Sequence, residues 1–251
     1  AVVQDISNAD TKPAGVLISG DCAYLSGNSE DYGVLLELLK PLREQGMPVH
    51  IALGNHDHRD RFRQAAGEAA WKTSLMEEKH TLMVSTPSAN WFILDSLDET
   101  NKTPGALGNA QLKWLTEALD RTADKPALVM MHHNPIDETL RADSTATVPR
   151  AKADEKPKVA GLTDTGPLFE VLLPRRHVKA LFFGHTHVWH VEQRDGLHLV
   201  NLPPTAYVFA NSKPNGWTNV TLTAGGMSLE LRCLNASHSL HKHRVDLTWR
   251  S

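Results

Sequence analysis

The chain has 251 residues, 41% of them hydrophobic, which is enough apolar sequence for one large domain with a substantial core. Its net charge of −3, from 26 basic and 29 acidic side chains, argues against the strongly basic surface that binds nucleic acid. Two cysteines do not make a disulfide framework, and no apolar stretch approaches the length of a membrane span.

Apolar runs alternate with amphipathic segments over the first three quarters of the chain, a pattern typical of an α/β fold. The predicted strands are residues 16–18, 49–53, 82–84, 91–94, 127–131 and 180–183. The predicted helices are residues 32–45, 59–70, 109–121 and 167–173, and residues 1–9 look like the end of a further helix. Helical spacing predicts the buried faces of two helices, formed by Val34, Leu35, Leu38, Leu39 and Leu42 in one and by Leu112, Leu115, Ala118 and Leu119 in the other.

Turn-forming sequences punctuate the last quarter of the chain and predict short strands joined as β-hairpins. The turns are at residues 194–196, 214–216 and 224–226. We therefore expect residues 190–251 to supply the strands of a second sheet within a single domain. Residues 137–165 are a long polar stretch that follows a candidate metal ligand, and they are expected to form either a lid over the substrate or a passive insertion.

Four polar clusters each follow a predicted strand at the point where that strand ends. They are Gly20-Asp21, Gly54-Asn55-His56-Asp57, His132-His133 and Gly184-His185-Thr186-His187. Because the carboxyl ends of neighbouring strands in an α/β sheet meet at one edge, we expect these side chains to converge. Carboxylate, amide and imidazole groups together can hold two divalent metal ions, and few other purposes need that mixture.

In this order and spacing, the clusters resemble the motifs of the calcineurin-like metallophosphoesterases. The match runs from Gly20 to His187. It resembles most the cyclic-nucleotide and glycerophosphodiester phosphodiesterase branch, because residues 132–135 form a His-His-x-Pro-like run. The resemblance implies an α/β fold built as a four-layer α-β-β-α sandwich of two mixed sheets, with a C-terminal part rich in β-hairpins.

The resemblance also assigns ligands to two divalent or trivalent metal ions, for which Mn, Fe and Zn all suit the residue types. Asp21, Asn55, His132 and His185 would hold one ion, and Asp21 and His187 would bind the other. The family's opening Asp-x-His motif, which supplies two further ligands, has no counterpart in this sequence. We therefore expect the chain to begin after its first strand, whereas a chain naturally this short would be a one-metal enzyme or an inactive relative.

The implied reaction is hydrolysis of a small-molecule phosphodiester, or of a phosphomonoester, by a hydroxide that the metal ions activate. His56 would protonate the leaving alkoxide or stabilise the charged phosphate. Asp57 is expected to orient His56 through a carboxylate–imidazole hydrogen bond. His58 and Arg59 follow and are candidates to face the substrate, with a solvated helix position an equal alternative for Arg59.

Two other functions stay open at this point. A purple-acid-type phosphomonoesterase would use a tyrosine ligand, and Tyr24 lies three residues after Asp21, at the spacing of that branch. A non-catalytic binding or scaffold protein would keep the fold and lose one metal site. Three further histidines, His238, His241 and His243, have no carboxylate or cysteine partner in register, and we interpret them as part of a solvated strand or tail.

Overall fold

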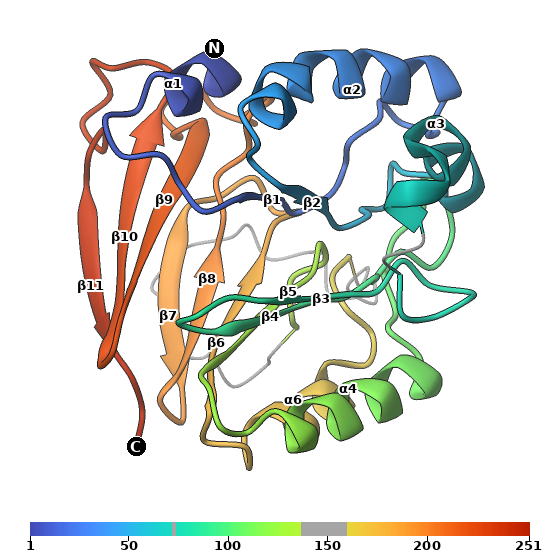
Figure 1. Ribbon diagram of the computed structural model, residues 1–251, viewed down its shortest axis with the longest axis vertical. Coiled ribbons are helices and arrows are strands. Elements are labelled where there is room, and N and C mark those ends of the chain that lie inside the picture. The colour runs from blue at the N-terminus through green and yellow to red at the C-terminus, as the bar shows by residue number, and fades with distance from the viewer. Residues whose placement is uncertain (72–73, 137–159) are drawn as a thin grey trace, which may run out of the picture.

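The computed structural model describes residues 1–71, 74–136 and 160–251. Figure 1 shows helices on two opposite sides of the molecule, with the β-sheets between them. On one side lie α1 (Val2–Ser7), α2 (Ser29–Glu44) and α3 (Arg59–Trp71), and on the other lie α4 (Asn109–Arg121) and α6 (Thr165–Leu172). The mixed α/β fold that the sequence predicts is therefore confirmed, as is a helix at the start of the chain.

One sheet has six strands in the order β3-β4-β5-β6-β8-β7. These strands are β3 (Leu82–Ser85), β4 (Asn90–Ile93), β5 (Ala127–Met130), β6 (Val178–Phe183), β7 (His190–Arg194) and β8 (Leu197–Asn201). The four central strands run parallel, while β3 and β7 at the two edges are antiparallel to their neighbours. The carboxyl ends of β4, β5, β6 and β8 therefore meet at one edge of the sheet.

Two smaller sheets complete the β structure of the described residues. The strands β1 (Val16–Ile18) and β2 (Val49–Ile51) form a parallel pair. The strands β9 (Gly216–Thr223), β10 (Gly226–Cys233) and β11 (Arg244–Thr248) form an antiparallel sheet in the order β11-β10-β9. Hydrogen bonding thus divides the described strands into three sheets, where the sequence analysis expected two.

The assignment of residues 190–251 to a second sheet is wrong for β7 and β8. Both strands extend the six-stranded sheet, since β8 pairs with β6 in parallel and β7 folds back on β8. All five residues of β8 are buried. A strand that is covered on both faces belongs inside a sheet between helices and a second layer, and only its tertiary partners reveal this.

Three hydrophobic clusters join these elements in layers. The first packs one face of the six-stranded sheet against α4 and α6, and it contains Leu115 of α4. The second packs the opposite face against the two smaller sheets, where Phe182 of β6 and Leu229 of β10 belong to one cluster. The third packs β1 and β2 against α1, α2 and α3, with Leu42 and Ile51 among its buried residues. The metal-ligand motifs follow strands of the two inner layers.

The predicted buried face is correct for α4 but only partly correct for α2. All four predicted apolar residues of α4 are buried. In α2, Leu39 and Leu42 are buried, whereas Val34 and Leu38 are each 61% exposed. Tyr32 is buried instead, and its hydroxyl accepts the His58 N–H at 2.7 Å. The apolar stripe of α2 is wider than the surface that β1 and β2 offer, so its margin stays in solvent.

The turns in the last quarter of the chain behave in two ways. The turns at residues 194–196 and 224–226 join β7 to β8 and β9 to β10, which confirms both predicted hairpins. The turn at residues 214–216 lies between β8 and β9, which belong to different sheets, so the prediction of a hairpin there is wrong.

Most of the predicted lid, residues 137–159, lies outside the described residues. The end of that polar stretch is packed against the fold, because Leu162 is buried and pairs with Gly105 and Pro135 in isolated β-bridges. Of the helices that the structure describes, none combines the length and the apolar character needed to cross a lipid bilayer.

Candidate metal centre

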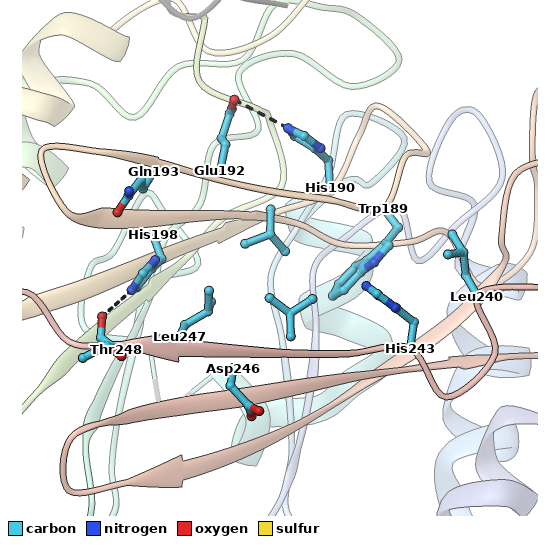
Figure 2. Close-up of a pocket in the computed structure, with 12 residues that line it drawn as sticks. Trp189, His190, Glu192, Gln193, His198, Leu240, His243, Asp246, Leu247 and Thr248 are labelled. Atoms are coloured by element: carbon cyan, nitrogen blue, oxygen red, sulfur yellow. Dashed lines mark hydrogen bonds and ion pairs between the residues drawn. The ribbon is translucent and has the colours of Figure 1, made fainter.

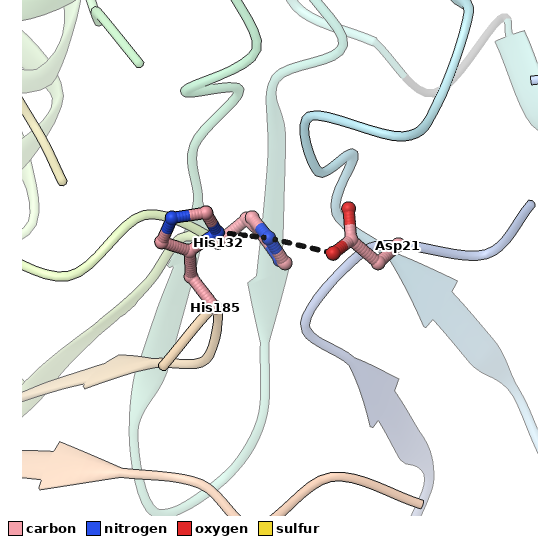
Figure 3. A group of neighbouring side chains, drawn as sticks. All are labelled: Asp21, His132 and His185. Atoms are coloured by element: carbon pink, nitrogen blue, oxygen red, sulfur yellow. Dashed lines mark hydrogen bonds and ion pairs between the residues drawn. The ribbon is translucent and has the colours of Figure 1, made fainter. Parts of the chain in front are cut away.

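Asp21, His132 and His185 converge from three different strands. Their ligand atoms all lie within 4.8 Å of one another. As Figure 3 shows, His132 stands between the other two: its Nε2 lies 3.2 Å from Asp21 Oδ2, and His185 Nδ1 lies 3.3 Å from His132 Nε2. Two imidazoles and a carboxylate at this spacing are a suitable ligand set for Mn, Fe or Zn.

The strands place His132 and His185 at the carboxyl edge of the six-stranded sheet and Asp21 at the carboxyl end of the β1–β2 pair. Asp21 follows β1, His132 follows β5 and His185 follows β6. The pairing of β5 and β6 continues into the ligand loops, where the Gly184 N–H donates to the His132 carbonyl at 2.9 Å. This bond keeps the two histidine loops in register, so their rings reach the same point.

A backbone carbonyl orients His132. Its Nδ1 lies 3.0 Å from the Ser19 carbonyl oxygen, which can only accept a hydrogen bond, so Nδ1 carries the proton of that bond. Nε2 is then the nitrogen directed towards Asp21. Metal-binding histidines are commonly fixed in this way by a partner on the other ring nitrogen.

Two glycines allow the loop after β1 to lie against the loop after β2. A Cβ on Gly20 would lie 2.6 Å from the Gly54 nitrogen and 2.8 Å from His132 Nδ1, and Gly20 has φ +110°. A Cβ on Gly54 would collide with Asp21 Oδ1 and lie 2.8 Å from His132 Cε1. Only residues without a side chain fit between these ligands, which explains the glycine in both motifs.

Three of the predicted ligands have a left-handed backbone. The φ angles are +54° for Asp21, +67° for His185 and +55° for His187. Residues other than glycine rarely adopt this conformation, which costs of order 1–3 kcal/mol each and is concentrated at functional sites. The surrounding loops impose this conformation on residues of the same cluster.

Asn55 has the chemistry of a ligand without a partner. It is buried, and its Oδ1 accepts no hydrogen bond. Both of its sequence neighbours reach Asp21: Gly54 by the close approach described above, and His56 through its backbone N–H, which donates to Asp21 Oδ1 at 3.0 Å. A buried amide oxygen without a hydrogen-bond partner, on a loop that contacts a carboxylate, is an atom that a cation would satisfy, and it therefore supports the fit of a metal.

His187 does not belong to the compact cluster of Asp21, His132 and His185. Its Nδ1 is nevertheless buried without a hydrogen-bond partner. Burial lowers the pKa of His187, and the negative charge of Asp21 opposes that shift, which indicates that the two side chains are electrostatic neighbours. This arrangement agrees with a ligand to a second ion that shares Asp21.

An ionised Asp21 and a neutral His185 suit cation binding, whereas a proton on His132 would compete with a cation. Burial raises the pKa of Asp21, but the hydrogen bond and charge of His132 outweigh burial, so the pKa lies well below its usual value. Burial and the adjacent His132 lower the pKa of His185 to about 4. Burial also lowers the pKa of His132, yet Asp21 reverses this effect and the pKa is raised. A cation between these groups would replace the proton that His132 holds against Asp21.

His56 and Asp57 do not make the hydrogen bond that the sequence analysis expected. The buried Asp57 carboxylate accepts backbone N–H groups from Cys22, Ala23 and Gly54 at 2.8–3.2 Å. Burial raises the pKa of Asp57 to about 6, against the effect of these bonds. His56 Nδ1 instead lies 3.0 Å from the carbonyl oxygen of Leu25. Asp57 therefore joins the two ligand loops, and Leu25 orients His56.

His133 is a buried residue of the site that the sequence analysis gave no role. Its Nδ1 lies 2.9 Å from Ser96 Oγ, and its ring lies 4.8 Å from the ring of His185. Burial and the neighbouring His132 lower the pKa of His133 to about 2, so it is neutral. Ser96 follows β4, 37 residues earlier in the chain, and no signal in the sequence connects it to residue 133.

Comparison with known families agrees with this geometry. The family model described as calcineurin-like phosphoesterase matches residues 1–189, which include every predicted ligand. The chain belongs to the calcineurin-like phosphoesterase family. The resemblance inferred from the four motifs is thereby confirmed.

Several relatives are similar to this calcineurin-like phosphoesterase. A probable cyclic nucleotide phosphodiesterase of Ruthia magnifica is 25% identical over 90% of this chain and 83% of its own length. The 3′,5′-cyclic adenosine monophosphate phosphodiesterase of Pseudomonas aeruginosa is 26% identical over 83% of this chain and 67% of its own. A probable glycerophosphodiester phosphodiesterase of Arcobacter nitrofigilis is 30% identical over 52% of this chain and 45% of its own.

A dimetal phosphatase from Danio rerio has a similar crystal structure. It aligns with 88% of this phosphoesterase and 79% of its own chain, with a TM-score of 0.62 and 12% sequence identity. At that identity the likeness shows a common fold.

Two residues near the centre of this phosphoesterase differ from expectation. Arg59 is more than a solvated helix residue, because its guanidinium forms an ion pair with the fully buried Asp95. The Asp95 carboxylate lies 2.6 Å from Arg59 Nε and 3.2 Å from Nη2. Tyr24, the candidate tyrosine ligand of a purple-acid-type enzyme, is 76% exposed.

A cavity of about 610 Å³ lies elsewhere in this phosphoesterase, between β7 and β11. Figure 2 shows two polar contacts among the residues that line it: His190 lies 3.6 Å from Glu192, and His198 Nε2 lies 2.7 Å from the Thr248 carbonyl oxygen. His243 lines the same cavity. No three ligand-type side chains converge here, since the Asp21 cluster is the only such group among the described residues.

Proposed function

We propose that this chain hydrolyses small-molecule phosphodiesters at a centre of two metal ions held by Asp21, Asn55, His132, His185 and His187. The relatives named above are called phosphodiesterases, whether their substrate is a cyclic nucleotide or a glycerophosphodiester. Their shared reaction supports a diester as the substrate of this chain.

One observation carries the proposal. The ligand atoms of Asp21, His132 and His185 lie within 4.8 Å of one another, and the loop after β2 that contacts Asp21 through the His56 N–H also carries the buried and unpaired Oδ1 of Asn55. Four ligands of this kind suffice for one ion of Mn, Fe or Zn. The second ion would be held by the other carboxylate oxygen of Asp21 and by His187, so its site has fewer ligands than the first.

When bound, such ions lower the pKa of a water molecule and neutralise charge on phosphate oxygens. Within the protein, Asp21 offers two carboxylate oxygens and so can contribute to both ions. Oδ1 of Asp21 accepts the His56 backbone N–H, while Oδ2 approaches His132 Nε2, so the two oxygens have different partners.

His56 is the residue proposed to act on the leaving group. The Leu25 carbonyl accepts the Nδ1–H of His56, so Nε2 is the nitrogen free to meet substrate. In the imidazolium form Nε2–H can donate to the departing oxygen or to a phosphate oxygen. Asp57 acts at a distance, by holding the loops that carry Asp21 and His56 together.

The experiment compares a diester and a monoester on protein loaded separately with Mn²⁺, Fe²⁺ or Zn²⁺. We expect hydrolysis of bis(p-nitrophenyl) phosphate to exceed that of p-nitrophenyl phosphate, to need metal, and to disappear in Asp21→Ala together with metal content. The matched control is Asp246→Ala, which removes an exposed carboxylate at the distant cavity. Protein that binds metal stoichiometrically and hydrolyses neither compound would contradict the proposal and favour a binding protein.

A further inference from the structure

Exposed aromatic side chains gather beside the metal centre. In the described part of the chain eight large hydrophobic side chains are exposed, and four of them are Tyr24, Leu25, Tyr207 and Phe209. Tyr207 is 61% exposed and Phe209 is 72% exposed. Large apolar surface left in water next to a polar centre requires an explanation, because its exposure is unfavourable unless a ligand covers it.

Tyr207 and Phe209 form one group of rings with His187. The Phe209 ring stacks on His187 with centroids 4.8 Å apart and an interplanar angle of 26°. The Tyr207 ring lies 5.8 Å from His187 and 5.3 Å from Phe209, edge-on to both. The candidate metal ligand His187 is therefore in direct ring contact with two exposed aromatic side chains.

The parallel pairing of β6 and β8 explains why the aromatic pair is here. The segment of residues 202–215 leaves β8 at the same edge at which β6 delivers His185 and His187. The Leu202 N–H donates to the Phe183 carbonyl at 2.7 Å, and Asn201 Nδ2 donates to Thr186 Oγ1 at 2.5 Å. These two bonds fasten the start of the aromatic segment to the histidine loop.

A second apolar patch flanks the centre on the loop after β1. Tyr24 is 76% exposed and Leu25 is 44% exposed, and the Leu25 carbonyl is the group that orients His56. The polar centre thus has exposed apolar residues on the loop that contacts His56 and aromatic side chains next to His187. A glycerol or ethanolamine substituent gains little from such a surface, whereas a nucleobase gains stacking on its π-face.

We propose that Tyr207 and Phe209 form a stacking subsite for a nucleobase, so that the substrate is a nucleoside phosphodiester. This inference rests on the proposed function, since the phosphate of the same molecule would lie at the metal centre. The base stacks on the ring of Phe209 and meets the perpendicular ring of Tyr207 at its edge, while the phosphodiester reaches past His187. Recognition by stacking tolerates any base, so the subsite selects nucleosides as a class.

The test measures the ratio of two catalytic efficiencies in the metal-loaded full chain. The substrates are 3′,5′-cyclic AMP and glycerophosphoethanolamine, which has no aromatic group. For Phe209→Leu we expect this ratio of kcat/KM values to fall about tenfold, the scale of one lost base–aromatic stack, through the KM for cyclic AMP. Tyr207→Leu should act in the same direction. Leu38→Ala, at an exposed apolar position on α2, is the control that leaves the ratio unchanged.

A binding measurement keeps the proposal testable if hydrolysis fails. Titration calorimetry with adenosine 5′-monophosphate and with glycerol 3-phosphate should show that Phe209→Leu weakens the nucleotide selectively. Absence of turnover of both diesters by the unaltered protein would refute the proposed function, and the calorimetry would still decide the stacking subsite. Equal losses for both ligands would mean that Phe209 only supports His187. No change for either would mean that the aromatic pair serves a macromolecular partner, and both results overturn the inference.

Discussion

Two histidine-rich regions of this phosphoesterase differ in what their histidines do. At the metal centre, His132 and His185 meet Asp21 from different strands. In the cavity between β7 and β11, His190 and His198 lie near Glu192 and the Thr248 carbonyl, and no cluster of three ligand-type groups forms in the described structure there. The number of histidines in a region therefore does not predict metal binding, whereas their positions in the fold do.

The difference has a backbone origin. The residues of the centre lie on loops at the carboxyl ends of parallel strands, where chains that are far apart in sequence converge. Several of these residues adopt left-handed φ angles, and Asn55 leaves a buried oxygen unpaired. His190 and His198 instead lie within the regular strands β7 and β8, where alternation directs side chains to the two faces of the sheet.

The largest effect is expected for His132→Ala. The change removes a ligand from the middle of the cluster and leaves Asp21 without its imidazole partner. Since loss of an outer-shell partner alone costs about 10- to 100-fold in metal affinity or activity, loss of this ligand should cost more than about 100-fold. Metal content by elemental analysis and diester hydrolysis are the measurements. Retention of stoichiometric metal with full activity would remove His132 from the centre.

Gly54→Ala tests whether close approach of the loops sets the ligand geometry. The added methyl group would collide with Asp21 Oδ1, so the loops after β1 and β2 must separate. A displacement of about 1 Å can lower a rate by up to about 100-fold, and we expect a loss approaching that size. Gly225→Ala is the control, because a Cβ there meets nothing within 4 Å. An equally small effect for both variants would show that the two loops can accommodate a methyl group and that their close approach does not set the ligand geometry.

Asp57→Asn tests the role that the structure gives this carboxylate. The new amide nitrogen would face backbone N–H groups of Cys22, Ala23 or Gly54 and leave at least one of them without an acceptor. An unpaired buried donor costs about 1–3 kcal/mol, and the free energy of unfolding should fall by that amount in urea titration of metal-free protein. If stability is unchanged and only the pH dependence of turnover moves, then Asp57 acts through His56 as first expected.

The smallest effect is expected in the second histidine-rich region. His243 is exposed and lines the β7–β11 cavity, so His243→Ala should change the free energy of unfolding by less than about 0.5 kcal/mol. Metal content and diester hydrolysis should equal those of the unaltered protein. Loss of a bound ion in this variant would reveal a metal site in the cavity and abolish the contrast between the two regions.

Much of the site was accessible from the sequence because short motifs end strands. The strand positions predicted that Asp21, His132 and His185 would converge, and the structure brings these three together. The motifs did not predict which other residues these side chains contact. Adjacency suggested that Asp57 would orient His56, whereas the carboxylate binds a loop 35 residues earlier in the chain.

Arg59 and the α2 helix show the same limit. Nothing near Arg59 in sequence indicates Asp95, the buried carboxylate with which it pairs across 36 residues. In α2, helical spacing identified an apolar stripe, but the area of β1 and β2 beneath it left Val34 and Leu38 in solvent. Partners and contact areas are properties of packing, and periodicity carries information only about one element at a time.

The amino-acid sequence alone predicted the family, the α/β alternation and the main ligand residues, since each is encoded within a few neighbouring positions. The assignment of β7 and β8 to the six-stranded sheet emerged from three-dimensional packing, as did the loop contact made by Asp57 and the aromatic pair beside His187. These features join segments that are distant in the chain. Their free energy depends on which surfaces meet, and local residue preferences cannot specify that meeting.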